Sequence, residues 1–372
     1  MAAASMFADI AKDAYLWALR AMARLLAPRV ATEPGRVLLV LAFPGRYDRL
    51  REQLLLSGLT IDEFEPGAVA SVSQLMKMLR AQFILVDNYY APLVAVTAAH
   101  RTIVQLWHAD GAVKKFGLAA HVTYSARALR RYRRVYEAFD HVLVGSEKMA
   151  EVFRRSFDLP DSKILRFGYV GADDYLAPDF SSRTNEVRAK YRLSGTTTVL
   201  YLPTFRTDDS ASQPQLEFIT RASGELGPGV RLLYHLHPQT AGRLAGDGAV
   251  TGSATAIRSD EVPALLASAD LLVTDYSGVV FERAMFRLPV AFFAYDYSEY
   301  SRTNGLVLDR EELPGPVFSE IGSLLEFISA GAFGDERIAS FGREWNEYND
   351  GRASERLVEH LVALKAQSRR AS

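Results

Sequence analysis

The sequence predicts an α/β protein built from two Rossmann-like halves. Short apolar runs, typical of buried parallel strands, alternate along the chain with segments of helical periodicity. A polar stretch at residues 177–190 interrupts this alternation, which then begins again. With 372 residues, the chain is long enough for two domains that each bury a core of their own.

The predicted strands are short apolar runs in both halves. In the first half they are residues 36–43, 83–87, 102–107, 142–145 and 164–167, with one more short strand between residues 46 and 80. In the second half they are residues 199–202, 230–236, 256–258, 271–273 and 290–293. Strands separated by helices form parallel sheets. Two such halves that face each other across a central cleft make up the GT-B architecture.

This organisation predicts four segments. They are an N-terminal amphipathic helix (residues 1–30), a first Rossmann-like domain (31–180), a second Rossmann-like domain (181–344) and a C-terminal helix that crosses back to the first domain (345–372).

The composition excludes several classes of protein. The absence of cysteine rules out disulfides, thiolate nucleophiles and thiolate metal sites. A net charge of −1 provides no overall field that would attract nucleic acid or a membrane. No apolar run reaches the roughly 18 residues that span a bilayer, and the N-terminus lacks the layout of a signal peptide. These features are compatible with a cytoplasmic protein.

Two features suit an anionic membrane surface. Residues 11–26 read as an amphipathic helix that carries Trp17 and several leucines beside Arg20 and Arg24. Such a helix lies in a membrane interface or docks on its own protein, and both interpretations stay open. The segment from Lys114 to Arg134 has seven basic residues, interleaved aromatic residues and no acid. It is a solvated face or a contact for anionic lipid; no recognised nucleic-acid-binding fold accompanies it, so no nucleic acid is expected.

The most informative stretch is residues 270–296, which reads as strand, polar turn, helix and strand. The turn lies at the carboxyl edge of the sheet, where open α/β sheets bind ligands. Ser277 and Gly278 begin the helix, where free backbone N–H groups favour an anion such as phosphate. Glu282 lies about one turn further and can accept hydrogen bonds from a ribose. The alternative is a plain N-cap at Ser277 and a surface carboxylate at Glu282.

The same stretch resembles the TDYSS-x-x-FE/D segment of the CDP-glycerol glycerophosphotransferase family, the primases and polymerases of teichoic acid synthesis. In that family the segment holds the diphosphate and the ribose of the nucleotide donor. Gly278 stands here in place of the second serine. The resemblance therefore implies diphosphate binding by Ser277 and Gly278 and ribose binding by Glu282.

Two histidines follow predicted strands. His108 closes the strand at residues 102–107, and a histidine at that edge is suited to proton transfer near neutral pH. A half-buried histidine bonded to a backbone carbonyl is the alternative. The stretch resembles the family's QLWHGTPLKK segment, whose histidine deprotonates the attacking hydroxyl. Here Ala109, Asp110 and Gly111 replace Gly-Thr-Pro, and Asp110 either orients His108 or excludes a different acceptor.

His237 and the loop before it resemble two further family segments. His237 matches the histidine of the family's His-Pro element, which supports the leaving group, whereas His235 is expected to be structural. The spacing of the two histidines also suits a metal pair, but no third ligand is evident, and we predict no metal and no cofactor. Thr204 and Arg206 lie in a segment similar to the family's APTWR, which implies contacts with donor phosphates.

These resemblances run in order from about residue 100 to residue 356 and imply a GT-B phosphotransferase. It would transfer glycerol phosphate from CDP-glycerol to a hydroxyl of a lipid-linked saccharide or polyol-phosphate acceptor, release CMP, and act in teichoic-acid-like or capsular polymer synthesis. We expect it at the cytoplasmic face of the membrane, bound peripherally; its oligomeric state is unknown. The alternatives are a glycosyltransferase or epimerase that uses a sugar nucleotide, and a non-catalytic nucleotide-binding protein at the membrane.

Overall fold

The computed structural model describes residues 2–67, 69–121, 124–206, 209–237, 240–241, 254–334 and 336–371. The chain forms two compact units, and each has its own parallel sheet. The first unit comprises the residues up to Asp110, Phe116–Leu176 and the residues from Glu347 onward. The second comprises Gly111–Lys115 and Ala177–Asn346. The predicted alternation of strands and helices in two successive halves is confirmed.

The sheet of the first unit has six strands in the order β2-β1-β3-β4-β5-β6, and every neighbouring pair is parallel. The strands are β1 (Glu33–Val40), β2 (Thr60–Phe64), β3 (Ala81–Val86), β4 (Thr102–Gln105), β5 (His141–Leu143) and β6 (Ile164–Leu165). The strand order reverses between β1 and β3, and crevices for ligands form at the carboxyl ends of strands beside such a reversal.

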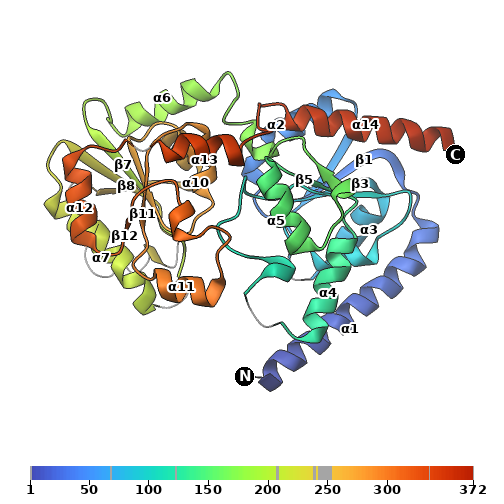
Figure 1. Cartoon of the computed structure of the whole chain (residues 1–372). Helices are drawn as coiled ribbons and strands as arrows, with labels where there is room; N and C mark the ends of the chain where they lie inside the picture. Colours follow the sequence, from blue (N-terminus) through green and yellow to red (C-terminus); the bar gives the residue numbers. More distant parts are fainter. Residues whose placement is uncertain are drawn as a thin grey trace. The chain divides into compact units, whose positions relative to one another are not determined.

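Helices cover both faces of this sheet (Figure 1). They are α1 (Ala2–Leu26), α2 (Asp48–Leu56), α3 (Val72–Arg80), α4 (Ala126–Glu137), α5 (Glu147–Phe157) and α14 (Ala353–Ala371). Leucines of α2 and α14 pack with alternate side chains of β1, β3 and β4 in one core. Because the strands are buried on both faces, they are continuously apolar in sequence.

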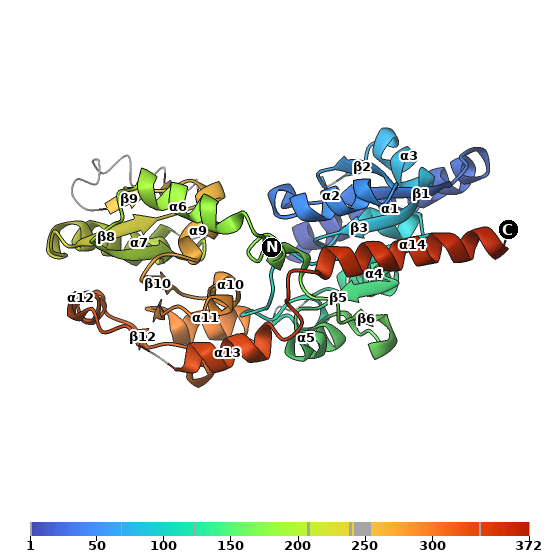
Figure 2. The same cartoon turned by 90° about the horizontal axis from the view of Figure 1, so that it is seen from above.

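Helix α1 has a buried side and an exposed side. Leu16, Leu19 and Ala23 are buried against the first unit, and α1 lies alongside α4 (Figures 1 and 2). In contrast, Trp17 is 74 % exposed and Leu25 is 66 % exposed. The helix therefore docks on its own protein and still presents large apolar side chains to its surroundings. No helix within the described ranges combines the length and the apolar character that crossing a bilayer requires.

The sheet of the second unit is also parallel, in the order β12-β11-β10-β7-β8-β9. The strands are β7 (Thr197–Leu202), β8 (Val230–Tyr234), β9 (Ala254–Ala256), β10 (Leu271–Thr274), β11 (Val290–Phe293) and β12 (Val317–Phe318). Here the order reverses between β7 and β10, which places a topological switch point at the ends of these two strands. The two-residue strand β12 was too short for the sequence pattern to indicate.

Helices of the second unit pack on both faces of its sheet. They are α6 (Phe180–Lys190), α7 (Asp209–Glu225), α9 (Val262–Leu266), α10 (Val279–Met285), α11 (Tyr297–Asn304), α12 (Ile321–Ala330) and α13 (Arg337–Trp345). Helices α7 and α12 share a core with alternate residues of β7, β8, β10 and β11, while α10 packs against α13. Both sheet faces are thereby covered by helices, and in open α/β sheets ligands bind at the carboxyl ends of the strands.

Candidate active site

The candidate donor residues of the second unit gather at the switch point between β7 and β10. Thr204 follows β7, and Asp275 follows β10. One carboxylate oxygen of Asp275 accepts hydrogen bonds from the backbone N–H of Thr204 (2.8 Å) and of Tyr276 (2.6 Å). Asp275 is only 2 % exposed. This buried carboxylate therefore holds the two loops of the switch point together.

The buried side chain of Arg206 forms an ion pair with the same carboxylate. Its Nη2 donates to Asp275 at 2.9 Å, and its Nε donates to Asp296, which follows β11, also at 2.9 Å. Its Nη1 donates to the backbone carbonyl of Thr204 at 2.9 Å. The guanidinium also lies over the ring of Tyr300, 4.6 Å from its centroid. Burial lowers the pKa of Arg206, but Asp275 and Asp296 outweigh this effect and raise that pKa above its usual value. Arg206 thus links the ends of three strands.

A short helix, α10, follows the predicted diphosphate-binding residues Ser277 and Gly278. Helix α10 is seven residues long, and Gly278 precedes it with right-handed angles (φ −64°, ψ −14°). The hydroxyl of Ser277 accepts a long hydrogen bond of 3.5 Å from the N–H of Val279. Glu282 is 2 % exposed. The alternative that Glu282 is a surface carboxylate is therefore wrong, because its side chain is buried.

Thr204 contributes a hydroxyl with unusual surroundings. Its oxygen is buried and has no hydrogen-bond partner among the residues that the structure describes. Buried hydroxyls are normally hydrogen-bonded. A ligand oxygen at this position would satisfy the group.

The two histidines near β8 differ in their surroundings. The Nδ1 of His235 lies 3.0 Å from the carbonyl oxygen of Ile257, as expected for a structural histidine. His237 is exposed, and its ring lies 4.1 Å from that of Phe205, centroid to centroid. Pro238 of the predicted His-Pro element lies outside the described residues. Within the described ranges, no three histidine or carboxylate side chains form a cluster that could hold a metal ion.

Lys114 also belongs to the second unit. Residues Gly111–Lys115 pair with the loop after α11. The N–H of Val307 donates to the carbonyl oxygen of Val113 at 2.8 Å, and Lys114 and Leu306 form an isolated antiparallel β-bridge. Burial lowers the pKa of Lys114 below its usual value, and the charge of Asp275 only partly opposes this shift. The sequence pattern placed this lysine in a basic run that is either a solvated face or a contact for anionic lipid. The structure shows instead that it lies near the buried charges of the switch point.

In the first unit, His108 lies just beyond the carboxyl end of β4. Its Nδ1 is 3.0 Å from the backbone carbonyl oxygen of Asp87, which directly follows β3. A carbonyl can only accept, so Nδ1 carries the proton in the neutral ring and Nε2 carries the lone pair. This arrangement suits Nε2 for the acceptance of a proton.

The backbone around His108 is held in an uncommon conformation. Trp107 has a φ of 62°, a left-handed value that is rare for a bulky residue. Tyr47 donates to the carbonyl oxygen of Trp107 at 2.7 Å, and Arg46 donates to that of His108 at 3.1 Å. Strained backbone of this kind persists only where its surroundings stabilise it. The strand predicted to reach residue 107 therefore ends earlier, at Gln105.

Asp110 contacts the segment that leads into α14. Its carboxylate accepts a hydrogen bond from the amide of Asn349 at 2.8 Å. It also lies against Gly145, where any Cβ would come within 2.1 Å of its oxygen. Asp110 thereby ties the end of the His108 segment to the segment that leads into α14.

The carboxyl edge of the first sheet contains one further buried acid. Asp87 accepts hydrogen bonds from the N–H groups of Ala42 (2.8 Å) and Phe43 (2.9 Å). Burial raises the pKa of this carboxyl group, and the hydrogen bonds from Ala42 and Phe43 oppose the rise. No sequence motif indicated Asp87 as a site residue. Its position at the end of a buried strand was the available signal.

Both units therefore carry polar side chains at the strand ends of a parallel sheet, as in nucleotide-dependent transferases of the α/β class. The chain matches the family model described as CDP-Glycerol:Poly(glycerophosphate) glycerophosphotransferase over residues 59–363. It is 35 % identical over 294 residues to the teichoic acid glycerol-phosphate primase of Bacillus spizizenii, which covers 76 % of this chain and 75 % of the relative. It is 27 % identical to the primase of the same name from Staphylococcus aureus, with 94 % and 97 % coverage.

A solved structure agrees with the fold. The wall teichoic acid polymerase TagF superposes with a TM-score of 0.75 at 19 % identity, and the match covers 98 % of each chain. The chain belongs to the CDP-glycerol:poly(glycerophosphate) glycerophosphotransferase family. The GT-B fold class, the family and the enzyme class, a CDP-glycerol glycerophosphotransferase, are confirmed as predicted. This membership favours the predicted transferase over a sugar-nucleotide enzyme and over a non-catalytic protein.

Proposed function

We propose that the enzyme transfers glycerol phosphate from CDP-glycerol to a hydroxyl of a lipid-linked saccharide or polyol-phosphate acceptor, as in teichoic-acid-like or capsular polymer synthesis. The observation that carries this proposal is the family match across residues 59–363, which includes His108 and the segment from Ser277 to Glu282. Both of these relatives carry the name teichoic acid glycerol-phosphate primase.

His108 is the proposed general base. The acceptor oxygen forms a bond to the phosphorus that carries glycerol, and the bond from that phosphorus to the bridging oxygen of CMP breaks. The acceptor proton passes to Nε2 of His108, since Nδ1 donates to Asp87. Such reactions depend mainly on positioning and on the stabilisation of phosphate charge.

The donor is proposed to bind the second unit. Ser277 and Gly278 contact the diphosphate, the hydroxyl of Thr204 finds a phosphate oxygen as its partner, and Glu282 accepts from the ribose. His237 supports the leaving CMP from its exposed position beside Phe205. Arg206 acts as a positioning residue, because its Nε, Nη1 and Nη2 already donate to protein oxygens. This role replaces the direct phosphate contact that the sequence suggested.

The membrane is the proposed source of the acceptor, with the enzyme bound peripherally at its cytoplasmic face. Trp17 and Leu25 are exposed on α1, and Arg130, Arg133 and Arg134 are exposed on α4. Part of the basic charge of α4 is neutralised by α1, because Arg131 pairs with Asp9 at 2.6 Å and with Asp13 at 2.9 Å. The remaining arginines suit anionic headgroups.

A kinetic comparison tests the base. His108→Ala should lower the rate of CMP release from CDP-glycerol by about 10²- to 10⁴-fold and leave CMP affinity within a factor of two or so. His121→Ala, a change at an exposed histidine of the same unit, is the matched control and should keep the rate. UDP-sugars, offered in place of CDP-glycerol, should release no nucleotide. A His108→Ala enzyme with normal turnover would remove this residue from the mechanism.

A further inference from the structure

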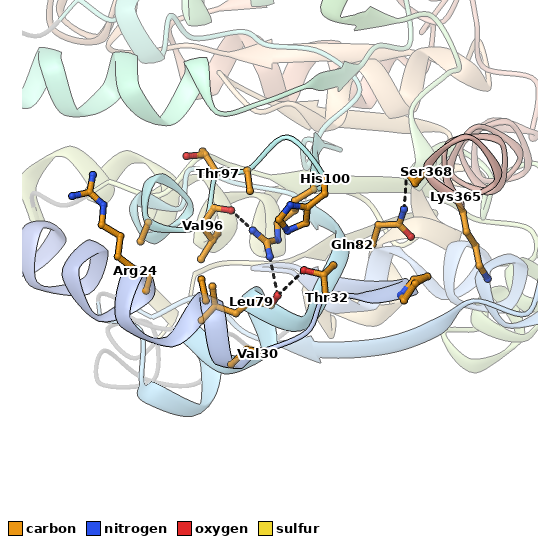
Figure 3. A pocket seen from close by; sticks show the side chains of 16 residues that line it. Arg24, Val30, Thr32, Leu79, Gln82, Val96, Thr97, His100, Lys365 and Ser368 are labelled. Atoms are coloured by element: carbon orange, nitrogen blue, oxygen red, sulfur yellow. Dashed lines mark hydrogen bonds between the residues drawn. The ribbon is translucent and has the colours of Figure 1, made fainter. Parts of the chain in front are cut away.

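A cavity of about 610 Å³ lies in the first unit at the amino-terminal edge of its sheet. The end of α1, the starts of β1 and β3, and the segment from Ala95 to Arg101 line it, together with the last turns of α14 (Figure 3). His108 follows the carboxyl end of β4, at the opposite edge of the same sheet. The cavity is therefore separate from the catalytic residues. Its volume falls within the roughly 300–1,000 Å³ of small-molecule sites.

The walls of the cavity suit a flexible hydrocarbon. Half of the lining residues are aliphatic or alanine, among them Val30, Leu79 and Val96, and the other half are polar or basic; no Phe, Tyr or Trp lines the cavity. Arg101 is buried in this wall and donates to the carbonyl oxygens of Leu79 (2.8 Å), Ala81 (2.9 Å) and Val96. These hydrogen bonds satisfy three backbone carbonyl groups of the wall. Apart from His100, the lining has no ring on which a nucleobase could stack.

The charged lining residues are all basic. Arg24 on α1 lies at one end of the cavity and Lys365 on α14 at the other, with apolar and polar lining residues between them (Figure 3). The lining contains no Asp or Glu. Neither Arg24 nor Lys365 forms an ion pair within the described part of the chain. Unpaired cations beside an apolar space attract an amphiphile with an anionic head.

The cavity also adjoins the surface proposed to meet the membrane. Ala23 and Arg24 line it, while their neighbours Met22 and Leu25 are exposed, Leu25 by 66 %. Lining residues and exposed apolar residues of α1 are thus neighbours along the helix. We propose that the cavity binds one phosphate-bearing lipid, with a hydrocarbon chain against Val30, Leu79 and Val96 and the phosphate at Arg24 or Lys365.

The inference rests on the proposed membrane association only for the source of the ligand. It predicts binding that is independent of catalysis, since the cavity and His108 lie at opposite sheet edges. The lipid would anchor and orient the enzyme rather than react.

Calorimetry with dodecyl phosphate, at concentrations at which it is monomeric, tests the proposal on the full chain. We expect one molecule to bind, with inorganic phosphate and neutral dodecyl maltoside each at least about tenfold weaker. Arg24→Glu/Lys365→Glu should weaken binding at least about tenfold, and so should Thr97→Trp, which places a large ring at an exposed position of the cavity lining. Equal affinity for the neutral amphiphile would overturn the anionic part of the proposal.

The matched control is Lys12→Glu/Arg29→Glu. It changes the net charge equally at exposed residues near the same helix that do not line the cavity, and it should bind dodecyl phosphate as the wild type does. Equal weakening in the control, or normal binding in both cavity variants, would refute the site. Farnesyl phosphate and dihexanoyl phosphatidylglycerol then distinguish an isoprenoid from a glycerophospholipid source, and failure of both to bind would also refute it.

A parallel assay separates this inference from the proposed function. The cavity variants should keep CMP release with a water-soluble acceptor within about twofold of wild type. A wild-type enzyme that binds dodecyl phosphate but never releases CMP from CDP-glycerol would refute the proposed function and leave the lipid site intact. Normal CMP release without binding of dodecyl phosphate would refute the lipid site and leave the proposed function intact.

Discussion

Replacement of Arg206 by methionine distinguishes a positioning role from direct phosphate binding. The guanidinium is 6 % exposed and pairs with Asp275, itself 2 % exposed, and with Asp296. Met keeps much of the side-chain length but leaves both carboxylates without their cation. Removal of one partner from a buried ion pair costs about 3–5 kcal/mol, because the remaining charge stays desolvated.

The expected loss is large enough to measure by calorimetry. For a unit of this size, each kcal/mol lowers the melting temperature by about 2–4 °C, so Arg206→Met should lower it by about 6–20 °C. Arg302→Met removes an exposed arginine of α11 in the same unit and should change stability by less than about 0.5 kcal/mol. Arg206→Met/Asp296→Asn should lose less than the sum of the two single changes, since it removes one of the uncompensated charges.

The same variants decide between the two roles when CMP binding is also measured. If Arg206 has a positioning role, Arg206→Met should lower both the melting temperature and the affinity for CMP, because the loops of Thr204 and Asp275 loosen. If Arg206→Met melts within about 2 °C of wild type, the buried ion pairs of Arg206 contribute little to the free energy of unfolding, and the inference from burial is wrong. A tenfold loss of CMP affinity at unchanged stability would identify Arg206 as a phosphate ligand.

Three further predictions concern other parts of the molecule. Glu282→Ala should weaken CMP binding by about 1.5–3 kcal/mol, because a ribose hydroxyl loses a charged acceptor, and unchanged affinity in calorimetry would remove Glu282 from the donor site. Burial lowers the pKa of His141 and of His360, whose Nε2 atoms lie 3.3 Å apart, so the unfolded chain takes up protons first below about pH 6.5. Stability should therefore fall from pH 7 to pH 5, and less so in His360→Asn; equal urea midpoint shifts would contradict this. Trp17→Ser/Leu25→Ser should make the release of the enzyme from anionic vesicles by high salt more complete than in wild type, since apolar insertion does not depend on charge; identical release would refute the role of α1.

The sequence alone determined the fold class and the family. Apolar runs without an exposed face specify parallel strands buried on both sides, and their alternation with helices specifies two Rossmann-like units. The polar residues that follow such runs, among them His108, Thr204 and Ser277, lie beyond the strand ends, because strands buried on both faces are mainly apolar. Local pattern was sufficient for these features.

The partners of those residues depended on the tertiary structure. Arg206 meets Asp275 and Asp296 across 69 and 90 residues of sequence, and it does so only because β7, β10 and β11 are adjacent in the sheet. The proton position on His108 follows from the carbonyl of Asp87, 21 residues earlier, in the loop of the neighbouring strand. Strand order is a property of the folded sheet that hydrophobic periodicity does not encode, so only the structure could decide which buried charges meet and which nitrogen is left to accept a proton.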